Sequence, residues 1–301
     1  MQLADAIILG DWGTTNLRLW LVGPDGTILD TVTSQDGAKG LAGSANADIF
    51  DKLTRPWRKT NAPSQAILCG MVGRKGGWIE APYLSTDNWG ALPRNLVQAE
   101  HGDMAVFVVP GLKTIRSDDV MRGEETQILG LVADTPDFTG TICMPGTHSK
   151  WCDLSNGKIT DFRTELTGEL FSLLSEGSTL RDAIEFGHCD DAFNDGVREA
   201  LKEQDAMQRL FSVRANWLLN NTRPEVGYSR LSGLLVGAEI ARACRKTDLE
   251  TVALVGANTL VDLYARALGQ AGVAATIHSG NMLVIQGLQR IAQDARDLIH
   301  G

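Results

Sequence analysis

Short apolar runs separated by turn residues open the chain and predict three strands. Ala6–Gly10 is apolar, and Asn16–Val22 alternates partly between apolar and polar residues. A turn at Pro24-Asp25-Gly26 then precedes Thr27–Val32. Such runs, bounded by Gly, Pro and Asp, are typical of β-hairpins. We therefore expect three strands joined by two tight turns.

The same order of signals recurs after Thr139. An apolar strand at Gly140–Met144 is followed by a loop at Pro145–Ser149. Two further strands, Lys150–Leu154 and Lys158–Arg163, flank an Asn156-Gly157 turn. Gly13-Thr14 of the first copy matches Gly146-Thr147 of the second. Internal repetition indicates a duplicated architecture with one copy per domain. We therefore divide the chain into two α/β domains, residues 1–136 and 137–301.

Apolar residues at helical spacing follow each copy and predict several helices. They are expected at Asp48–Trp57, from near Asp119, and at Leu166–Ser175, Val197–Leu219, Leu231–Cys244, Thr259–Leu268 and Met282–Leu298. Further strands are expected at Met104–Val109, Thr251–Val255 and Ala274–Ile277. The last two strands and the helix between them predict a βαβ unit.

Composition narrows the class of protein. The 301 residues are 43% hydrophobic and 22% charged, with a formal net charge of −9. A sizeable core can be buried, whereas a broad basic surface for nucleic acid or membrane does not fit this balance. The five cysteines include no C-x-x-C pair, so neither a disulfide framework nor a zinc ribbon is expected. Without a signal-peptide pattern or a run of ~20 apolar residues, we expect a cytoplasmic protein.

Two loops rich in hydrogen-bond donors occupy equivalent places in the two copies. Asp11-Trp12-Gly13-Thr14-Thr15-Asn16 follows the first strand, and Pro145-Gly146-Thr147-His148-Ser149-Lys150-Trp151 follows its counterpart. Glycine permits close approach of a ligand, and hydroxyl and N–H groups bind anions. For the first loop taken alone, an ordinary hairpin turn is the better explanation. As a pair, the two loops predict a binding site for a chain of phosphates, and the carboxylate oxygens of Asp11 are suited to Mg²⁺.

A cluster of acids lies between these loops in the sequence. Asp118-Asp119-Val120-Met121-Arg122-Gly123-Glu124-Glu125-Thr126-Gln127 follows a Pro110-Gly111 turn. Acids at a helix N-terminus are stabilised by the helix dipole, so capping is one interpretation. In the other, Asp119 is a general base that removes a proton from the hydroxyl of a substrate.

Several longer motifs carry a resemblance to a known family. They are DWGTTNLR, GMVGRKGGWIEAPY, PGL, DVMRGEETQILG, PGTHSKW, TGELF and SGLLVGAEI, which lie between Asp11 and Ile240, and the resemblance as a whole spans residues 8 to about 290. With them the chain resembles the 2-dehydro-3-deoxygalactonokinases, which belong to the sugar kinase, hexokinase, Hsp70 and actin superfamily. The resemblance implies two pseudo-symmetric RNase H-like (actin-like ATPase) domains with an interdomain cleft. It also implies transfer of the γ-phosphate of ATP, with Mg²⁺, to the 6-hydroxyl of 2-dehydro-3-deoxy-D-galactonate in the De Ley–Doudoroff route of galactose breakdown.

The resemblance assigns roles to individual residues. It makes residues 1–136 the substrate-side domain and 137–301 the nucleotide-binding domain, with Asp119 as catalytic base and Asp11 near the metal. Phosphate and ATP contacts are expected from Gly13, Thr14, Thr15, Asn16, Gly146, Thr147, His148, Gly256 and Asn258. Substrate contacts are expected from Arg74, Trp78, Glu80, Arg122, Glu124 and Lys150.

The carboxylate of a sugar acid needs a cation in a protein that is acidic overall. Arg74, Lys75, Arg122 and Lys150 are the candidates, and Arg122 is preferred because arginine suits bidentate carboxylate recognition. Each could instead be a solvated surface charge.

Two positions depart from the family pattern. Arg74 stands where Ser is common, and Glu165-Leu166 stands where an apolar, Met-containing pair is usual. Both leave the phosphate motifs intact and bear on the choice of substrate. The alternatives are a kinase for another 2-keto-3-deoxy sugar acid and a non-catalytic nucleotide-binding scaffold of the actin or Hsp70 kind. Apolar helices in the second domain would suit a homodimer, the commonest oligomer.

Overall fold

The computed structural model describes residues 6–39, 43–60, 63–99, 101–102, 104–115, 118–202, 206–256 and 258–300. Contacts group the chain into two units. Unit 1 comprises Met1–Thr139, Leu154–Phe162 and Gly280–Gly301, and unit 2 comprises Gly140–Asp153 and Arg163–Ser279. The segment from Gly280 onward therefore packs with unit 1 elements, and the division of the sequence at residue 136 stays a prediction.

A mixed six-stranded sheet forms the centre of unit 1. Its strand order is β3-β2-β1-β4-β7-β6, with β1 antiparallel to β2 and parallel to β4. The bounds are β1 Ile7–Trp12, β2 Leu17–Val22, β3 Ile28–Ser34, β4 Gln65–Gly70, β6 Val97–Ala99 and β7 Ala105–Val108. The three strands predicted at the start of the chain are thus confirmed.

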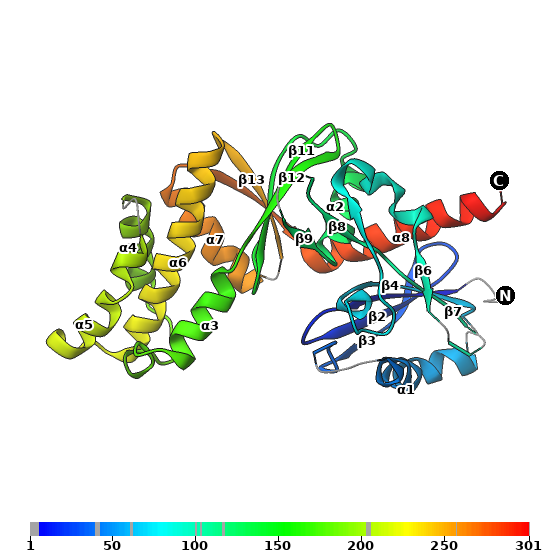
Figure 1. The fold of residues 1–301 in the computed structure, drawn as a ribbon, viewed down its shortest axis with the longest axis horizontal. Helices are drawn as coiled ribbons and strands as arrows, with labels where there is room; N and C mark the ends of the chain where they lie inside the picture. Colours follow the sequence, from blue (N-terminus) through cyan, green and yellow to red (C-terminus); the bar gives the residue numbers. More distant parts are fainter. Residues whose placement is uncertain are drawn as a thin grey trace. The chain divides into compact units, whose positions relative to one another are not determined.

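Helices cover both faces of this sheet, with α1 (Ser44–Thr60) on one side and α8 (Gly280–His300) on the other (Figure 1). Phe50 and Trp57 of α1 are buried in a core cluster with alternate strand residues such as Ile8 and Trp12. The period of two along a strand explains why Ile7 and Leu9, which are also buried, face the opposite side. α2 (Glu124–Asp134) packs against α8.

A small three-stranded sheet precedes α2 and was not expected from the sequence. It has the order β5-β8-β9, with β5 Tyr83–Ser85, β8 Gly111–Lys113 and β9 Val120–Met121. The 3₁₀ helices η1 Met71–Gly73 and η2 Thr86–Arg94 lie in the same stretch of chain. The expectation that a helix begins near Asp119 is wrong, because Val120 and Met121 pair with β8 and the helix begins only after Gly123.

Unit 2 repeats the strand order of unit 1. Its sheet runs β12-β11-β10-β13-β14, which corresponds to β3-β2-β1-β4-β7, and β13 is parallel to both β10 and β14. Leu154–Phe162, at the end of β11 and in β12, belongs to this sheet although its contacts group it with unit 1. The bounds are β10 Gly140–Met144, β11 Ser149–Ser155, β12 Lys158–Glu165, β13 Thr251–Gly256 and β14 Ala274–Ser279. The predicted duplication of an α/β unit is therefore confirmed.

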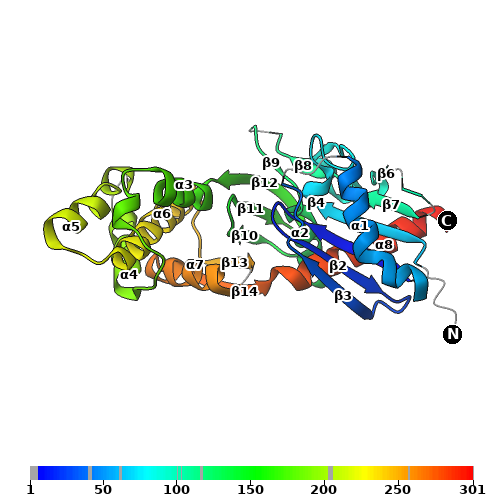
Figure 2. The ribbon, with the colours of Figure 1, turned by 90° about the horizontal axis from the view of Figure 1, so that it is seen from below.

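Helices of unit 2 gather beside its sheet, as Figure 2 shows for α4, α6 and α7. The helices are α3 Thr167–Gly177, α4 Asp190–Lys202, α5 Ser212–Asn220, α6 Pro224–Lys246 and α7 Asn258–Gln270, with η3 Arg181–Ala183 and η4 Ala206–Arg209. The single helix expected at Val197–Leu219 is wrong. The polar run Lys202-Glu203-Gln204-Asp205 interrupts the apolar spacing, and α4 ends at Lys202.

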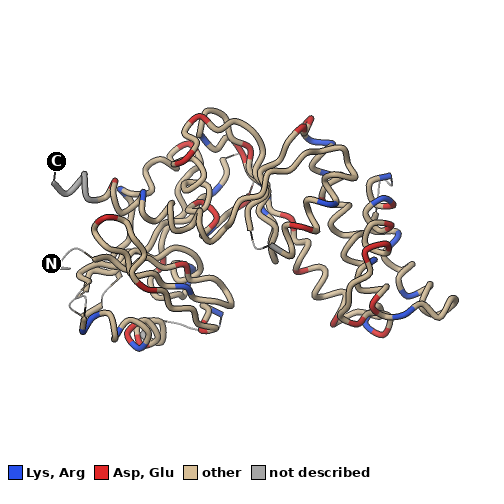
Figure 3. The backbone as a smooth tube through the Cα atoms, turned by 180° about the vertical axis from the view of Figure 1, so that it is seen from behind, with Lys and Arg blue, Asp and Glu red and all other residues tan. Residues whose placement is uncertain are grey.

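Acidic and basic residues are interspersed along the chain (Figure 3). Among the described residues, no helix combines the length and apolar character needed to traverse a lipid bilayer. All five cysteines are free thiols.

Candidate functional site

An acidic group lies where β1 and β4 end side by side in unit 1. Asp11 and Cys69 are register partners on these parallel strands, and Cys69 Sγ lies 3.9 Å from Asp11 Oδ1. Asp11 also faces Arg18 across the antiparallel β1–β2 pair, with Arg18 Nη1 3.7 Å from Asp11 Oδ2. Arg18 in turn donates to Asn281 Oδ1 at the beginning of α8. The Asp11 carboxylate at the end of β1 is therefore held by neighbours on both adjacent strands, Arg18 on β2 and Cys69 on β4.

Two glycines bring the beginning of α2 close to the ends of β1 and β4. Gly70 ends β4 with φ 89°, and Gly123 precedes α2 with φ 107°, values that other residues rarely adopt. A Cβ on Gly123 would lie 3.3 Å from the Cα of Gly70. A Cβ on Gly70 would lie 2.7 Å from the carbonyl oxygen of Trp12. A side chain at Gly123 would push the beginning of α2 away from β4, and one at Gly70 would collide with the backbone of β1.

The first turn of α2 contributes two more carboxylates. Glu124 is partly exposed, and its Oε2 accepts a hydrogen bond of 3.0 Å from the backbone N–H of Arg122. Glu125 is fully buried and accepts hydrogen bonds from the N–H of Gly123 and the hydroxyl of Thr126. Burial, followed by the charge of Glu124, raises the pKa of Glu125 to about 7. Glu125 is therefore a buried cap of this turn, and Glu124 is the more accessible carboxylate.

The surroundings of Asp11 suit a hard cation. Burial raises its pKa to about 6, although the Arg18 charge lowers the pKa and the Glu124 charge adds to the rise. Such an environment favours a proton or another positive charge beside the carboxylate. Within the described ranges, no three His, Cys, Asp or Glu side chains are arranged to hold a metal ion. The fit is thus to an ion such as Mg²⁺ that takes one carboxylate and keeps water or phosphate as its other ligands.

The loop after β1 is a closed turn with exposed hydroxyls. The N–H of Gly13 donates to the carbonyl oxygen of Asn16 at 2.9 Å, and Thr14, Thr15 and Asn16 are exposed. Residues 37–39 pack against the turn through backbone hydrogen bonds to its carbonyl groups. This arrangement leaves side-chain donors of the turn pointing to solvent, as a phosphate loop requires.

Arg122 is a buried cation with unused donors. The residue is only 9% exposed, its Nη2 donates to the carbonyl oxygen of Ala81 at 2.7 Å, and its Cζ lies 4.3 Å from the centre of the Tyr83 ring. Gly73 makes room for the guanidinium, since a Cβ there would lie 2.9 Å from Nη1. Nε and Nη1 are buried without a hydrogen-bond partner among the residues that the structure describes. Buried donors of this kind are rare without a ligand or water.

The other predicted substrate residues are spread over several environments. Arg74 donates to the carbonyl oxygens of Lys75 and Ala38, whereas Lys75 and Glu80 are exposed. Trp78 packs edge-on against Trp12 and joins the core of unit 1. Lys150 lies in unit 2, where it is buried and donates to Thr164 at 2.6 Å.

Asp119 lies at the edge of the small sheet of unit 1. Its Oδ1 accepts a hydrogen bond of 2.7 Å from the N–H of Val120, and its carbonyl oxygen accepts one from Thr114. The carboxylate whose charge raises the pKa values of both Asp11 and Glu125 is that of Glu124.

In unit 2 the second donor-rich loop packs on the beginning of α3. Thr147 and His148 are exposed, His148 Nε2 lies 2.7 Å from Glu169 Oε2, and the N–H of Glu169 donates to the carbonyl oxygen of Thr147. Gly168 permits this approach, because a Cβ there would lie 2.5 Å from the carbonyl oxygen of Gly146. The loop is thereby tied to the N-terminus of a helix, whose N–H groups favour anions.

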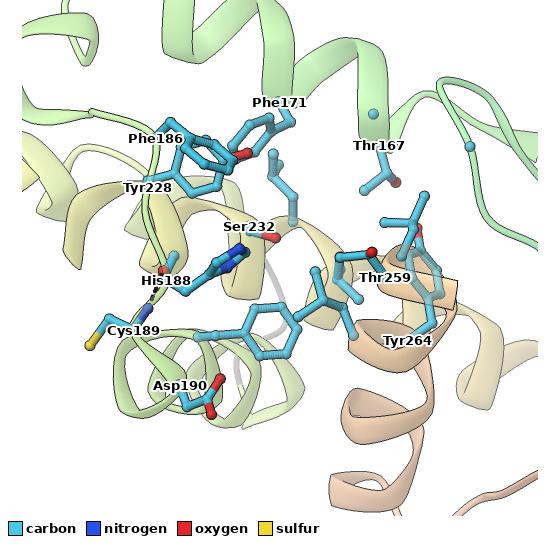
Figure 4. A pocket seen from close by; sticks show the side chains of 18 residues that line it. Thr167, Phe171, Phe186, His188, Cys189, Asp190, Tyr228, Ser232, Thr259 and Tyr264 are labelled. Atoms are coloured by element: carbon cyan, nitrogen blue, oxygen red, sulfur yellow. Dashed lines mark hydrogen bonds between the residues drawn. The ribbon is translucent and has the colours of Figure 1, made fainter. Parts of the chain in front are cut away.

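Beside this loop, unit 2 contains an apolar pocket of about 320 Å³. Phe171, Phe186 and Tyr228 cluster at one end, and Thr167, Thr259 and Tyr264 lie at the other (Figure 4). Gly146 of the loop is part of the lining. The size and the aromatic walls suit a flat heterocycle with a few polar groups. Sequence reasoning missed these walls, because they come from α3, α4, α6, α7 and the segment before α4.

Gly256 and Asn258, which were predicted to contact the adenosine of ATP, come just before the pocket residues Thr259 and Leu260 in the sequence. Gly256 ends β13, and a Cβ there would lie 3.0 Å from Val261 of α7. Asn258 begins α7, and its side chain lies outside the described residues. Arg18, Glu125 and Asn281 were also missed, although Arg18 and Glu125 belong to motifs that the sequence singled out.

Comparison with known proteins identifies relatives over nearly the whole chain. A family model described as 2-keto-3-deoxy-galactonokinase matches residues 11–291. The chain is 35% identical over 295 residues to a "Probable 2-dehydro-3-deoxygalactonokinase" of Rhizobium meliloti (strain 1021), with 94% of this chain and 95% of the relative covered. It is also 35% identical over 287 residues to the 2-dehydro-3-deoxygalactonokinase of Escherichia coli (strain K12), covering 94% and 96%.

Solved structures agree with the fold. A crystal structure from Sinorhizobium meliloti, described as a 2-dehydro-3-deoxygalactonokinase protein, has a TM-score of 0.87 at 34% identity, covering 96% of this chain and 98% of that one. The activator of 2-hydroxyisocaproyl-CoA dehydratase from Clostridium difficile has a TM-score of 0.51 at 13% identity, covering 97% of each chain. At that identity, the second likeness concerns the fold alone.

Proposed function

Because the chain belongs to the 2-keto-3-deoxy-galactonokinase family, we propose that it transfers the γ-phosphoryl group of ATP to the 6-hydroxyl of 2-dehydro-3-deoxy-D-galactonate. The observation that carries the choice of a sugar-acid acceptor is Arg122, whose buried guanidinium keeps two donor atoms without a partner among the residues that the structure describes. A carboxylate supplies both the charge and the acceptors that this group lacks. Tyr83, stacked on the guanidinium, holds its plane in place.

We assign the nucleoside of ATP to the apolar pocket of unit 2. Aromatic side chains at one end offer faces for adenine, and the hydroxyls of Thr167, Thr259 and Ser232 offer hydrogen bonds. Gly146 connects the pocket lining to the loop at 145–149. The phosphates then meet the exposed donors of that loop, Thr147 and His148.

Transfer needs a base that removes the proton from the 6-hydroxyl. As that oxygen bonds to the γ-phosphorus, the bond from phosphorus to the bridging oxygen breaks and ADP leaves. We propose Glu124 as the base, ahead of the sequence-based choice Asp119. Both side chains are partly exposed and each accepts a hydrogen bond from a backbone N–H. The choice rests on the electrostatic coupling of Glu124 to Asp11, whose pKa its charge raises.

Asp11 is the residue that would hold Mg²⁺ in this scheme. When bound to ATP, the ion neutralises phosphate charge as the transfer proceeds. Asp11 contributes one carboxylate from a strand end, with Arg18 fixing its orientation. Glu125, buried beneath, keeps the first turn of α2 in place through the N–H of Gly123.

Identification of the product tests the proposed reaction. The protein is incubated with ATP, Mg²⁺ and 2-dehydro-3-deoxy-D-galactonate, and the product is examined by ³¹P–¹H correlation spectroscopy. A phosphate ester coupled to the protons on C6 supports the proposal. A phosphate ester at another carbon, or inorganic phosphate alone, contradicts it. We further propose a homodimer in the cytoplasm, which light scattering on the purified protein and fractionation of cells test separately.

A further inference from the structure

Glu239 of α6 is a carboxylate buried at the centre of unit 2. It has no solvent exposure. Its Oε1 accepts a hydrogen bond of 2.6 Å from Trp151 Nε1, and its Oε2 accepts one of 2.7 Å from the Tyr264 hydroxyl. The Thr167 hydroxyl donates a third. These donors come from β11, α7 and the first residue of α3, so one carboxylate joins three elements to α6.

None of these three partners carries a positive charge. Burial therefore raises the pKa of Glu239, opposed by its hydrogen bonds. A carboxylate in such a place costs more free energy than a well-packed apolar side chain would. Core stability alone is a poor explanation for the group. A satisfied buried network does, however, fix the positions of its members relative to one another.

The members of this network adjoin the loop and the pocket. Ser149, which ends the predicted loop 145–149 and begins β11, is buried, and its hydroxyl lies 3.0 Å from the Tyr264 hydroxyl, so the hydrogen-bond chain extends from Glu239 to the end of the loop. Thr167 precedes Gly168, which touches the backbone of Gly146. Thr167 and Tyr264 both line one end of the pocket (Figure 4). Every group that Glu239 holds is thus in the pocket wall or next to the loop.

We infer that Glu239 is a positioning residue for the nucleotide. It fixes the wall formed by Thr167 and Tyr264 relative to the loop 145–149, so that the nucleoside and the phosphates of one molecule fit both at once. Preorganisation of this kind lowers the cost of ordering a ligand. The inference rests on the proposed function, because it takes the pocket to be the nucleoside site.

Glu239→Gln is the first test, because glutamine keeps the shape and one acceptor oxygen but offers its NH₂ group to a donor. We expect the Kd for ADP, measured by titration calorimetry, and the KM for ATP to rise by about tenfold or more. The KM for the sugar acid should stay within about twofold, because its proposed site lies in unit 1. Tyr264→Phe should raise the Kd for ADP in the same direction, and the double variant should show less than the product of the two effects.

Glu199→Gln is the matched control. Glu199 lies on α4 of the same unit and pairs with Arg209 and Arg230, so the variant also removes a charge and weakens contacts. It should leave the Kd for ADP unchanged. A role of Glu239 confined to stability would lower the melting temperature and the fraction of active protein without changing the Kd of the folded protein.

The outcomes separate this inference from the proposed function. A folded Glu239→Gln variant with unchanged Kd and KM for the nucleotide overturns the inference, as does an equal effect in Glu199→Gln. If Glu239→Gln does not fold, Tyr264→Phe with the wild-type Kd for ADP overturns it. Wild-type protein that binds ADP but phosphorylates no sugar acid contradicts the proposed function instead, and the ADP titrations still decide the role of Glu239.

Discussion

Glu125 accepts a hydrogen bond of 2.6 Å from the backbone N–H of Gly123, two residues earlier in the chain. Gly123 holds φ 107° and lies against Gly70 at the end of β4. The buried carboxylate thus stabilises the bend that places the first turn of α2 beside Asp11. Its position has a measurable consequence for stability.

Glu125→Gln should make the protein less sensitive to pH. The pKa of Glu125 is about 7 in the folded protein and 4.5 as a reference for the unfolded chain, so the folded state binds the proton more tightly. The contribution to stability is therefore present below pH 4.5 and is lost as pH rises through about 7. Relative to the variant, the wild type should lose about 2–3 kcal/mol of unfolding free energy between about pH 5 and pH 8.

Urea unfolding at both pH values measures this difference. Glu250→Gln, an exposed substitution in unit 2, is the control and should follow the wild type at both values. Parallel loss of stability in wild type and Glu125→Gln would show that Glu125 does not titrate in this range.

Glu124→Gln and Asp119→Asn distinguish the two candidates for the base. Glutamine keeps an oxygen for the N–H of Arg122 but cannot accept a proton. We expect kcat to fall by about 100-fold or more in Glu124→Gln, and by less than about tenfold in Asp119→Asn. Steady-state kinetics with saturating ATP measures both. The reverse order would return the role to Asp119.

Arg122→Lys should weaken binding of the sugar acid selectively. Lysine keeps the charge but loses the planar group that stacks on Tyr83 and bonds to Ala81. We expect the KM for the sugar acid to rise by about 10- to 100-fold, with the Kd for ADP unchanged. Arg94→Lys, at an exposed position of the same unit, should change neither value. An unchanged KM in Arg122→Lys would move the carboxylate site to Arg74 or Lys75.

Ser232→Phe should fill the apolar pocket. Ser232 lies on α6 and lines the pocket (Figure 4), so a phenyl ring there occupies the space assigned to adenine. The Kd for ADP should rise by about tenfold or more, while the KM for the sugar acid stays the same. Ser172→Phe on the exposed side of α3 is the control. ADP binding unaffected by Ser232→Phe would mean that the nucleoside lies elsewhere.

Local patterns in the sequence predicted most of the strands and the duplication. Apolar runs and Asn-Gly or Asp-Gly turns depend on neighbouring residues only, so β1–β3 and β10–β12 were found from them. The beginning of α2 was not predicted correctly, because the extended backbone of Val120 and Met121 depends on pairing with β8. The carboxylate of Glu239 and the pocket walls depend on packing between segments far apart in the chain, which periodicity does not record.

Asp11, Arg122 and Glu124 were recognised from their motifs, but their environments were not. Burial of the Arg122 guanidinium and the coupling of Glu124 to Asp11 arise only when β4 and α2 meet at Gly70 and Gly123. The residue types in the motifs therefore indicated which side chains could act, whereas their burial and their electrostatic coupling follow from the fold.

Release of ADP with Mg²⁺-ATP and a panel of acceptors tests the central claim most directly. The panel contains 2-dehydro-3-deoxy-D-galactonate, its gluconate epimer, glucose, glycerol and a control without acceptor. We predict the highest kcat/KM for the galactonate compound and no turnover without an acceptor. Equal or faster turnover of the gluconate epimer would contradict the proposed substrate. ADP release independent of any acceptor would contradict a sugar-acid kinase altogether.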